Sequence, residues 1–545
     1  AGVTLDQPQR DRFKWIVQRL SELSSKFEEN LLDATQGWKK IITDHRKLSG
    51  LPETTLEYAR NTAKAEGVDG WALTLEAPSY LPALMYLDDP DMRKEIYQSS
   101  TTRASDRGPN ACIWDNTSVI EEILHLRHEQ ALLLGFNNFA EYSLSTKMAQ
   151  DTDQVVSFLD HLSSKAKIMA EEELDDLRAF VSNNYGINNL NAWDIAYYSE
   201  KLRKHRYDVN QENLRPYFPI NRVLSGLFDI VNRLYGLSIL ERNDIDVWSK
   251  NVQFFEIRDE NKTLRGQFYL DLFSRPHKRG GAWMDECHVR CLVNGQIQTP
   301  VAYLVCNFTP PADGKQALLT HDDVTTLFHE FGHGLHHLLT KVDYSAISGI
   351  NGVEWDAIEL PSQFMENWCW QKESVQLISA HVKTGDPLPD SDFKKLQTAK
   401  NFQSGMKMIR QLEFAQFDFL VHMMFDPTND GHVQETLDRV RRNIAVIIPP
   451  AFNRFAHSFS HIFSGGYAAG YYSYLWAEVL AADAYELFEE NGTFDPGTGR
   501  HFLNSILERG GSRDAMQLFI EFRGRTPCIK ALLRQNGIEA NGVGG

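Results

Sequence analysis

The segment THDDVTTLFHEFGHGLHHLLTK (320–341) carries the strongest structural signal in this chain of 545 residues. Its apolar residues recur at the three- and four-residue spacing of one helical face. They are Val324, Leu327, Phe328, Phe331, Leu335 and Leu338. Thr320 is a preferred residue type for a helix N-cap, and Asp322 and Asp323 place negative charge at the positive end of the helix dipole. The pattern predicts a buried helix that begins near residue 320.

His329, Glu330 and His333 lie within this predicted helix in the pattern HExxH. Residues four apart lie on one helical face about one turn from each other, so two imidazoles at this spacing can bind one Zn²⁺. The glutamate between them lies near that face and can reach a water molecule at the metal. The motif therefore predicts a zinc site on this helix.

A third protein ligand must come from another part of the chain. The pattern HExxHxxGxxH is excluded, because His336 replaces its glycine and Leu339 replaces its last histidine. The following segment, GVEWDAIELPSQFMENWCW (352–370), contains four carboxylates, at Glu354, Asp356, Glu359 and Glu366. We therefore look for the third ligand in this segment.

Asp356 and Glu359 are three residues apart and would face the same way on a helix. We predict Glu359 as the third ligand and Asp356 as the acceptor for the N–H of a ligand histidine. The same spacing also fits a capping box, with Asp356 at the N-cap and Glu359 at the third helical position, and spacing alone leaves both interpretations open. We expect Glu366 to be a solvated or structural charge. Three further histidines are expected to be structural; they are His321, His336 and His337.

The segment HSFSHIFSGGYAAGYYSYLWAEVL (457–480) is dense in small and aromatic residues. Gly465 and Gly466 permit a flexible loop or a close backbone approach. One interpretation is an aromatic-rich core helix. The functional alternative is that His461 and one or two of the tyrosines donate hydrogen bonds to a developing oxyanion.

The rest of the chain is predicted to be mainly helical, with one small sheet. Amphipathic helical patterns recur at 15–23, 116–135, 152–182 and 221–237. Three short segments rich in β-branched and aromatic residues are typical of strands. They are VQFFEI (252–257), GQFYLDLF (266–273) and VAYLVCNF (301–308). An edge of this sheet, within the second or third of these segments, is expected to bind an extended peptide by strand addition.

Composition excludes several classes of protein. The chain is 42% hydrophobic and 24% charged, as is typical of globular proteins. Its 56 Lys and Arg against 73 Asp and Glu give a net charge of −17, which argues against binding nucleic acid or an anionic membrane. No apolar run reaches the length of about 18 residues needed for a membrane span. Six scattered cysteines favour a reducing, cytoplasmic compartment, and the first residues lack the pattern of a secretory signal.

Taken together, the motifs resemble the thimet oligopeptidase (M3) family of zinc metallopeptidases. The resemblance covers essentially the whole chain, although family members usually carry a further N-terminal helical stretch that is missing here. It is carried by HEFGH (329–333), WDAIELPSQFMENWCW (355–370), SHIFSGGYAAGYYSYLWAEVL (460–480), KRGGAWMD (278–285), WDIAYYSEKL (193–202), LRPYFP (214–219) and FRGRTP (522–527).

The resemblance implies roles for individual residues. His329, His333 and Glu359 correspond to the ligands of one zinc ion per chain, which favours the ligand interpretation of Glu359 over the capping box. Glu330 corresponds to the general base.

The resemblance also implies that Tyr467, Tyr474 and His461 contact substrate or stabilise the transition state. The implied fold is mainly α, with two helical lobes around a deep central channel and a small β-sheet near the zinc site. We expect residues 1–260 to form a helical lobe and residues 261–545 the catalytic lobe.

The implied activity is zinc-dependent hydrolysis of internal bonds in short, unstructured peptides by a monomeric, cytoplasmic enzyme. A close alternative is a peptidyl-dipeptidase that releases C-terminal dipeptides. A non-catalytic peptide-binding protein is disfavoured because all three ligands and the base are present. An aminopeptidase of another HExxH family is disfavoured because no GxMEN motif precedes residue 329.

Overall fold

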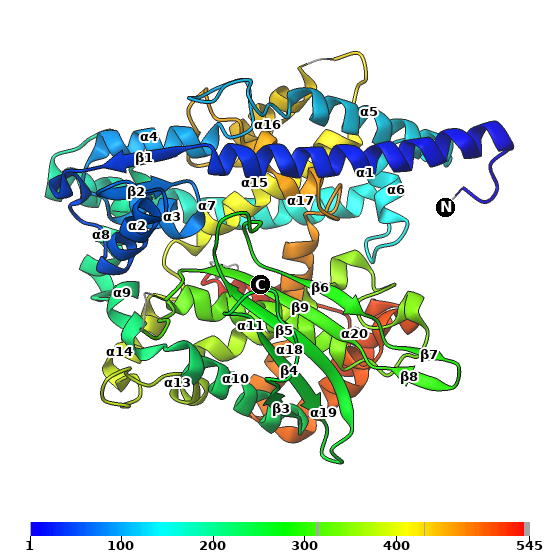
Figure 1. Cartoon of the computed structure of the whole chain (residues 1–545). Coiled ribbons are helices and arrows are strands. Elements are labelled where there is room, and N and C mark those ends of the chain that lie inside the picture. The colour runs from blue at the N-terminus through cyan, green and yellow to red at the C-terminus, as the bar shows by residue number, and fades with distance from the viewer. Residues whose placement is uncertain (1, 312–314, 430, 539–545) are drawn as a thin grey trace, which may run out of the picture. The chain divides into compact units, whose positions relative to one another are not determined.

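The computed structural model (Figure 1) describes residues 2–311, 315–429 and 431–538. The chain divides into two compact units, and each unit combines two separate stretches of sequence. Unit 1 combines Ala1–Leu202 with Gln403–Ser473, and unit 2 combines Arg203–Phe402 with Tyr474–Gly545. This division differs from the boundary expected near residue 260.

Helices make up nearly all of unit 1. Its longest helix, α7 (Thr152–Tyr185), packs along α15 (Ser404–Met423) and so joins the two stretches of the unit. A small antiparallel pair, β1 (Lys39–Ile42) with β2 (Trp71–Thr74), was not predicted from the sequence. The other helices are α1 (Gln7–Gln36), α2 (Glu53–Ala65), α3 (Ala77–Tyr86), α4 (Pro90–Thr101), α5 (Thr117–Leu133), α6 (Phe139–Leu144), α8 (Ile195–Tyr207), α16 (His432–Ile444) and α17 (Ser460–Phe463).

Unit 2 contains a five-stranded sheet in the order β3-β4-β5-β9-β6. Only β5 and β9 run parallel to each other, and the other neighbours are antiparallel. The strands are β3 (Ser238–Glu241), β4 (Gln253–Arg258), β5 (Leu264–Phe273), β6 (Trp283–His288) and β9 (Val301–Phe308). The three predicted strand segments are thereby confirmed as β4, β5 and β9.

The strand order corrects one expectation about this sheet. The segments 266–273 and 301–308 were expected to offer an edge for an extended peptide, but β5 and β9 pair with each other at its interior. The two edges are β3 and β6. Which strand lies at an edge depends on pairing between distant segments, so periodicity along one strand does not reveal it.

Helix α11 (His321–Leu338) lies against this sheet, where it contacts β9, β6 and β5 (Figure 1). All six residues of the predicted apolar stripe are buried. Thr320 is the N-cap, as the sequence indicated, and it also forms a capping box with Asp323. A Cβ at Gly334 would lie 3.0 Å from the side chain of Leu304, so this glycine lets the helix approach β9 closely. The predicted buried helix is confirmed.

Unit 2 contains a hairpin and several helices besides this layer of sheet and helix. A short hairpin joins β7 (Cys291–Val293) to β8 (Gln296–Gln298). The helices are α9 (Gln211–Leu214), α10 (Ile220–Tyr235), α12 (Leu360–Glu366), α13 (Lys372–Ile378), α14 (Asp390–Thr398), α18 (Ser473–Asn491), α19 (Pro496–Phe502), α20 (Ala515–Arg523) and α21 (Lys530–Gln535). Across the described residues, no helix combines the length and apolarity that crossing a membrane requires.

Candidate metal centre

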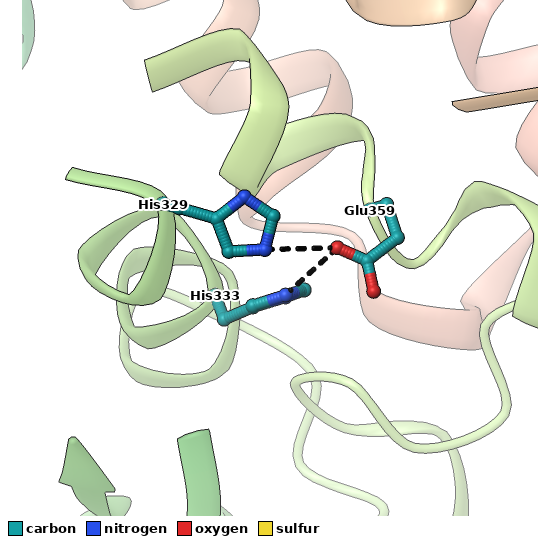
Figure 2. A group of neighbouring side chains, drawn as sticks. All are labelled: His329, His333 and Glu359. Atoms are coloured by element: carbon teal, nitrogen blue, oxygen red, sulfur yellow. Dashed lines mark ion pairs between the residues drawn. The ribbon is translucent and has the colours of Figure 1, made fainter. Parts of the chain in front are cut away.

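His329 and His333 project from α11 towards a single carboxylate, that of Glu359 (Figure 2). The Nε2 atoms of both histidines lie 3.1 Å from Oε2 of Glu359. The three potential ligand atoms lie within 4.8 Å of one another. In the part of the chain that the structure describes, no other group of three His, Cys, Asp or Glu side chains could hold a metal in this way. The structure thus brings together the three residues predicted as ligands.

Glu359 is held in place by a close approach of α12 to α11. A Cβ at Gly332 would lie 2.4 Å from the carbonyl oxygen of Pro361 and 2.6 Å from Cα of Ser362, so only glycine fits here. Ser362 also donates a hydrogen bond from Oγ to Glu359 Oε2 at 2.9 Å. The glycine of HEFGH therefore brings the start of α12 to within reach of the two histidines.

The capping-box interpretation of Asp356 and Glu359 is wrong. Glu359 is itself the N-cap residue of α12, and its side chain makes no capping hydrogen bond. Asp356 lies in a separate short 3-10 helix, Trp355–Ala357, where it is completely buried. Its predicted role as an acceptor for a ligand histidine stays a prediction.

The charges of the cluster are complementary. Burial favours the neutral form of Glu359, but the neighbouring imidazoles of His333 and His329 outweigh it and hold the pKa of this carboxyl well below its usual range. Burial likewise opposes the charged form of His329, yet hydrogen bonds with Glu359 and Glu366 raise the pKa of this imidazole well above its usual range. The site thus stabilises an anionic oxygen of Glu359 next to the Nε2 atoms of the two histidines.

Glu366 has a role that sequence reasoning missed. Its Oε1 lies 2.7 Å from Nδ1 of His329, so it is not merely a solvated charge. A proton on Nδ1 that is donated to Glu366 leaves Nε2 of the same ring as the nitrogen that could bind a metal. The spacing of seven residues from Glu359 to Glu366, two helical turns, was the signal that could have placed both on one face.

Glu330 is adjacent in sequence to His329, and it is a buried carboxyl with one oxygen that makes no hydrogen bond to the described residues. It is 5% exposed, and its Oε2 has no hydrogen-bond partner among the described residues. Burial raises the pKa of this carboxyl above its usual value. A buried carboxyl with a free oxygen and a raised pKa is suited to accepting and returning a proton.

The other histidines of this region lie apart from the metal cluster, as expected. His321 is the first residue of α11, and its Nε2 lies 2.9 Å from the carbonyl oxygen of Cys369. His337 Nε2 lies 3.0 Å from the carbonyl oxygen of His288. Burial lowers the pKa of His336 to about 3, so this ring is a neutral part of the core.

The three residues that are predicted to donate hydrogen bonds to an oxyanion belong to different units. His461 and Tyr467 belong to unit 1, where their ring centroids lie 6.2 Å apart. Tyr474 belongs to unit 2 and is the second residue of α18. Its carbonyl oxygen accepts a hydrogen bond of 2.9 Å from Gln363 Nε2, which links the start of α18 to α12. Their catalytic roles stay predictions.

Comparison with known proteins gives consistent matches over almost the whole chain. The profile described as Peptidase family M3 matches residues 83–538. The chain is 54% identical to Oligopeptidase A of Haemophilus influenzae and 53% identical to Oligopeptidase A of Escherichia coli, in each case over 99% of this chain and 79% of that protein. It is 34% identical to Dipeptidyl carboxypeptidase of Escherichia coli, over 99% of this chain and 78% of that protein.

Solved structures share the fold at low sequence identity. The chain of "PZ peptidase A with inhibitor 2" aligns with a TM-score of 0.61 at 15% identity, covering 98% of this chain and 77% of that one. A putative oligoendopeptidase F aligns with a TM-score of 0.59, also at 15% identity, covering 97% of this chain and 77% of that one.

Proposed function

The chain belongs to peptidase family M3, and we propose that it is a zinc-dependent oligopeptidase that hydrolyses internal bonds of short peptides. The observation that carries this proposal is the convergence of His329, His333 and Glu359 beside the buried carboxyl of Glu330. The identity of more than half of the aligned residues with two Oligopeptidase A proteins supports the same reaction.

The side chains of the cluster fit a zinc ion. Two imidazole nitrogens and one carboxylate oxygen are a donor set of catalytic zinc sites, in which a fourth position stays open. Oε2 of Glu330 has no hydrogen-bond partner among the described residues, so it is available to a water molecule at such a site. When bound, zinc supplies Lewis-acid polarisation of the peptide carbonyl and makes a water molecule more acidic. We assign one ion per chain to His329, His333 and Glu359.

Glu330 is the proposed general base and acid. It takes the proton of the attacking water molecule and returns it to the amine that leaves the cleaved bond. Its buried position and raised pKa favour holding that proton between the two steps.

The remaining predicted residues have supporting roles in this proposal. Tyr474, Tyr467 and His461 donate hydrogen bonds to the oxygen that becomes negative during attack, and losing one such donor typically lowers the rate by about 10²–10³. Asp356 accepts a hydrogen bond from the N–H of a ligand histidine, a role like that of Glu366 towards His329.

The substrate is proposed to bind along β6. This strand is an edge of the five-stranded sheet, so its outward backbone groups can pair with an extended peptide. It directly follows the basic Gly-Gly segment at 278–282, which the sequence placed among the family-like motifs. Cytoplasmic location and a monomeric state also stay predictions of the sequence.

A peptidyl-dipeptidase is the second candidate, because a Dipeptidyl carboxypeptidase is 34% identical over 99% of the chain. Mass spectrometry of the products from a peptide of about ten residues separates the two activities. An endopeptidase cuts internally and leaves fragments of several lengths. A peptidyl-dipeptidase shortens the peptide by two residues at a time from its C-terminus.

The proton-transfer role of Glu330 is tested by Glu330→Gln. We expect bound zinc to stay at the wild-type level, because the ligands are unchanged, while kcat falls by about 10²–10⁴, the usual contribution of such a group. Metal content and peptide cleavage are measured on the same sample. The control is Glu373→Gln, which changes an exposed glutamate of α13 and should leave both unchanged. Wild-type turnover by Glu330→Gln would contradict the mechanism.

A further inference from the structure

Asp418 of α15 is a completely buried carboxylate that binds the backbone of residues 469–471. Its Oδ1 accepts a hydrogen bond from the N–H of Ala469 at 2.9 Å. Its Oδ2 accepts hydrogen bonds from the N–H groups of Gly470 and Tyr471, both at 2.8 Å. Three consecutive N–H groups that converge on one anion form a concavity of the kind that ordinarily binds anionic ligands. In this protein the anion is supplied by the chain itself.

The bound backbone adopts a conformation that needs such support. Ala469 has φ +44°, in the left-handed region that residues with a Cβ rarely adopt. Hydrogen bonds to an ionised carboxylate are about twice as strong as those between neutral groups, and three of them act here together. Asp418 therefore offsets the strain of the turn that directly follows Tyr467.

The negative charge of Asp418 is balanced inside unit 1. Nδ1 of His422 lies 2.8 Å from the carbonyl oxygen of Asp418 and 3.1 Å from its Oδ1. Nη1 of Arg127 lies 3.0 Å from Nε2 of the same ring. Because a guanidinium group only donates, Nε2 of His422 accepts and Nδ1 carries the ring proton. Burial lowers the pKa of Arg127 to about 10, and the charge of Asp418 opposes that shift. A buried cation, a neutral imidazole and a carboxylate thus form one chain of contacts.

Tyr471 transmits this anchoring to the two donors that we propose in unit 1. Its hydroxyl donates to Oε1 of Gln411 at 3.0 Å, so α15 holds this tyrosine at its backbone and at its ring. The ring of Tyr471 packs edge-on against His461 at 5.5 Å, and its centroid lies 6.5 Å from that of Tyr467. A displacement of Tyr471 would therefore move the surroundings of both side chains.

The carbonyl side of the same turn is held independently by α6. The hydroxyl of Ser143 lies 2.9 Å from the carbonyl oxygen of Ala468 and 3.1 Å from that of Ala469. Lys147 Nζ donates to this hydroxyl at 2.7 Å, so the Ser143 proton is directed at the turn. The turn is thus held at its N–H groups and at its carbonyl groups. It follows the glycine pair Gly465 and Gly466, which permits a flexible loop.

We propose that Asp418 is a positioning residue of the peptidase reaction, which fixes the turn 468–471 so that Tyr467 is presented to the substrate. This inference rests on the proposed function, in which Tyr467 stabilises the developing oxyanion. Asp418 acts through the turn and Tyr471. It differs from an ordinary structural aspartate in one measurable way, because its effect on turnover must pass through Tyr467.

The test is a double-mutant cycle between Asp418→Asn and Tyr467→Phe in the zinc-loaded enzyme. We expect Asp418→Asn to lower kcat by about 10- to 100-fold with little change in KM or bound zinc, below the ceiling set by loss of a whole oxyanion donor. In the Tyr467→Phe background, the same substitution should lower kcat by no more than about threefold. Equal effects in both backgrounds, or an unchanged kcat of Asp418→Asn, would overturn the proposal.

A matched control separates positioning from general stability. Glu173 of α7 also binds backbone N–H groups with a partly buried carboxylate, those of Gly405 and Met406 at the start of α15. Glu173→Gln should lower the melting temperature while leaving kcat close to the wild-type value. If Glu173→Gln lowers kcat as much as Asp418→Asn does, the effect is one of stability and the proposal fails.

Two further measurements keep the outcome decisive. If Asp418→Asn does not fold, Ser143→Ala takes its place in the cycle, with an expected severalfold loss of kcat that again disappears in the Tyr467→Phe background. If Tyr467→Phe alone keeps the wild-type kcat, the oxyanion role of Tyr467 in the proposed function is wrong. A loss of kcat in Asp418→Asn would then have to pass through another residue, and the positioning proposal as stated would fall with that role.

Discussion

At the scale of single residues, the contact of Glu366 with Nδ1 of His329 leaves Nε2 as the nitrogen that faces the proposed metal site. The 2.7 Å contact to Nδ1 both selects the tautomer and adds negative charge behind the ring. We expect Glu366→Gln to weaken zinc binding by about 10- to 100-fold, since a glutamine can still accept the hydrogen bond but carries no charge. The measurement is the zinc dissociation constant from competition with a chelator.

Two further variants serve as controls for the zinc affinity of Glu366→Gln. Glu354→Gln changes a carboxylate of the same segment that binds the N–H of Ala515, and it should bind zinc as the wild type does. Glu359→Ala removes a proposed ligand, so its zinc dissociation constant shows how much affinity is lost when a ligand is missing. Equal dissociation constants for Glu366→Gln and Glu354→Gln would contradict the role of Glu366.

The sequence was sufficient to find the residues of the cluster but not all of its surroundings. HExxH places two imidazoles on one face by helical geometry alone, and family resemblance pointed to Glu359. The contact of Glu366 with His329 depends on the distance between two helices, and that distance is set by Gly332. Spacing within one helix cannot supply such a distance.

At the scale of elements, Gly332 sets how closely α12 approaches α11. A Cβ at this position would meet backbone atoms of Pro361 and Ser362 at 2.4 and 2.6 Å, which cannot move without shifting α12 and with it Glu359. We expect Gly332→Ala to lower the free energy of unfolding by about 1–3 kcal/mol, as overpacking does, and to weaken zinc binding. Urea unfolding and chelator competition measure the two effects.

Gly334→Ala, two residues along the same helix, is the matched control. Its Cβ would meet the end of the Leu304 side chain at 3.0 Å, which can move, and alanine favours the helix by up to about 1 kcal/mol. Zinc binding should therefore stay near the wild-type value. The explanation fails if both alanine variants bind zinc equally well.

Element types were predictable here, whereas their pairing was not. Helical periodicity identified α11, and enrichment in β-branched and aromatic residues identified the strands β4, β5 and β9. Neither signal could show that β5 and β9 are inner neighbours while β6 forms an edge. Strand order is fixed by contacts between segments that are far apart in the chain.

At the scale of the whole molecule, each unit is assembled from two separate stretches of chain. The sequence suggested a single boundary near residue 260, between a helical lobe and a catalytic lobe that contains the small sheet. The helix α15 returns to pack along α7, more than 200 residues earlier, so the units follow spatial contacts and not sequence order. A continuous division of the sequence cannot reproduce such an arrangement.

His457 lies where the two stretches of unit 1 meet, and it links their stability to pH. Its Nε2 lies 3.0 Å from Oγ1 of Thr117, and its carbonyl oxygen accepts a hydrogen bond of 3.2 Å from Asn116 Nδ2. Burial lowers the pKa of this imidazole to about 4, although the charges of Asp115 and Asp106 oppose the shift. In an unfolded chain the pKa returns to about 6.5. Between these two values, only the unfolded chain binds the extra proton.

We therefore expect the free energy of unfolding to fall as the pH decreases from about 6.5 to about 4, by up to about 3 kcal/mol from this one group. His457→Gln should remove that part of the slope, because glutamine fills the site without titrating. Urea unfolding at pH 7, 5.5 and 4.5 measures the slope. His161→Gln, at an exposed position of α7, should keep the wild-type slope. If His457→Gln loses stability towards low pH as steeply as the wild type does, then proton uptake by His457 does not link acid conditions to the opening of unit 1.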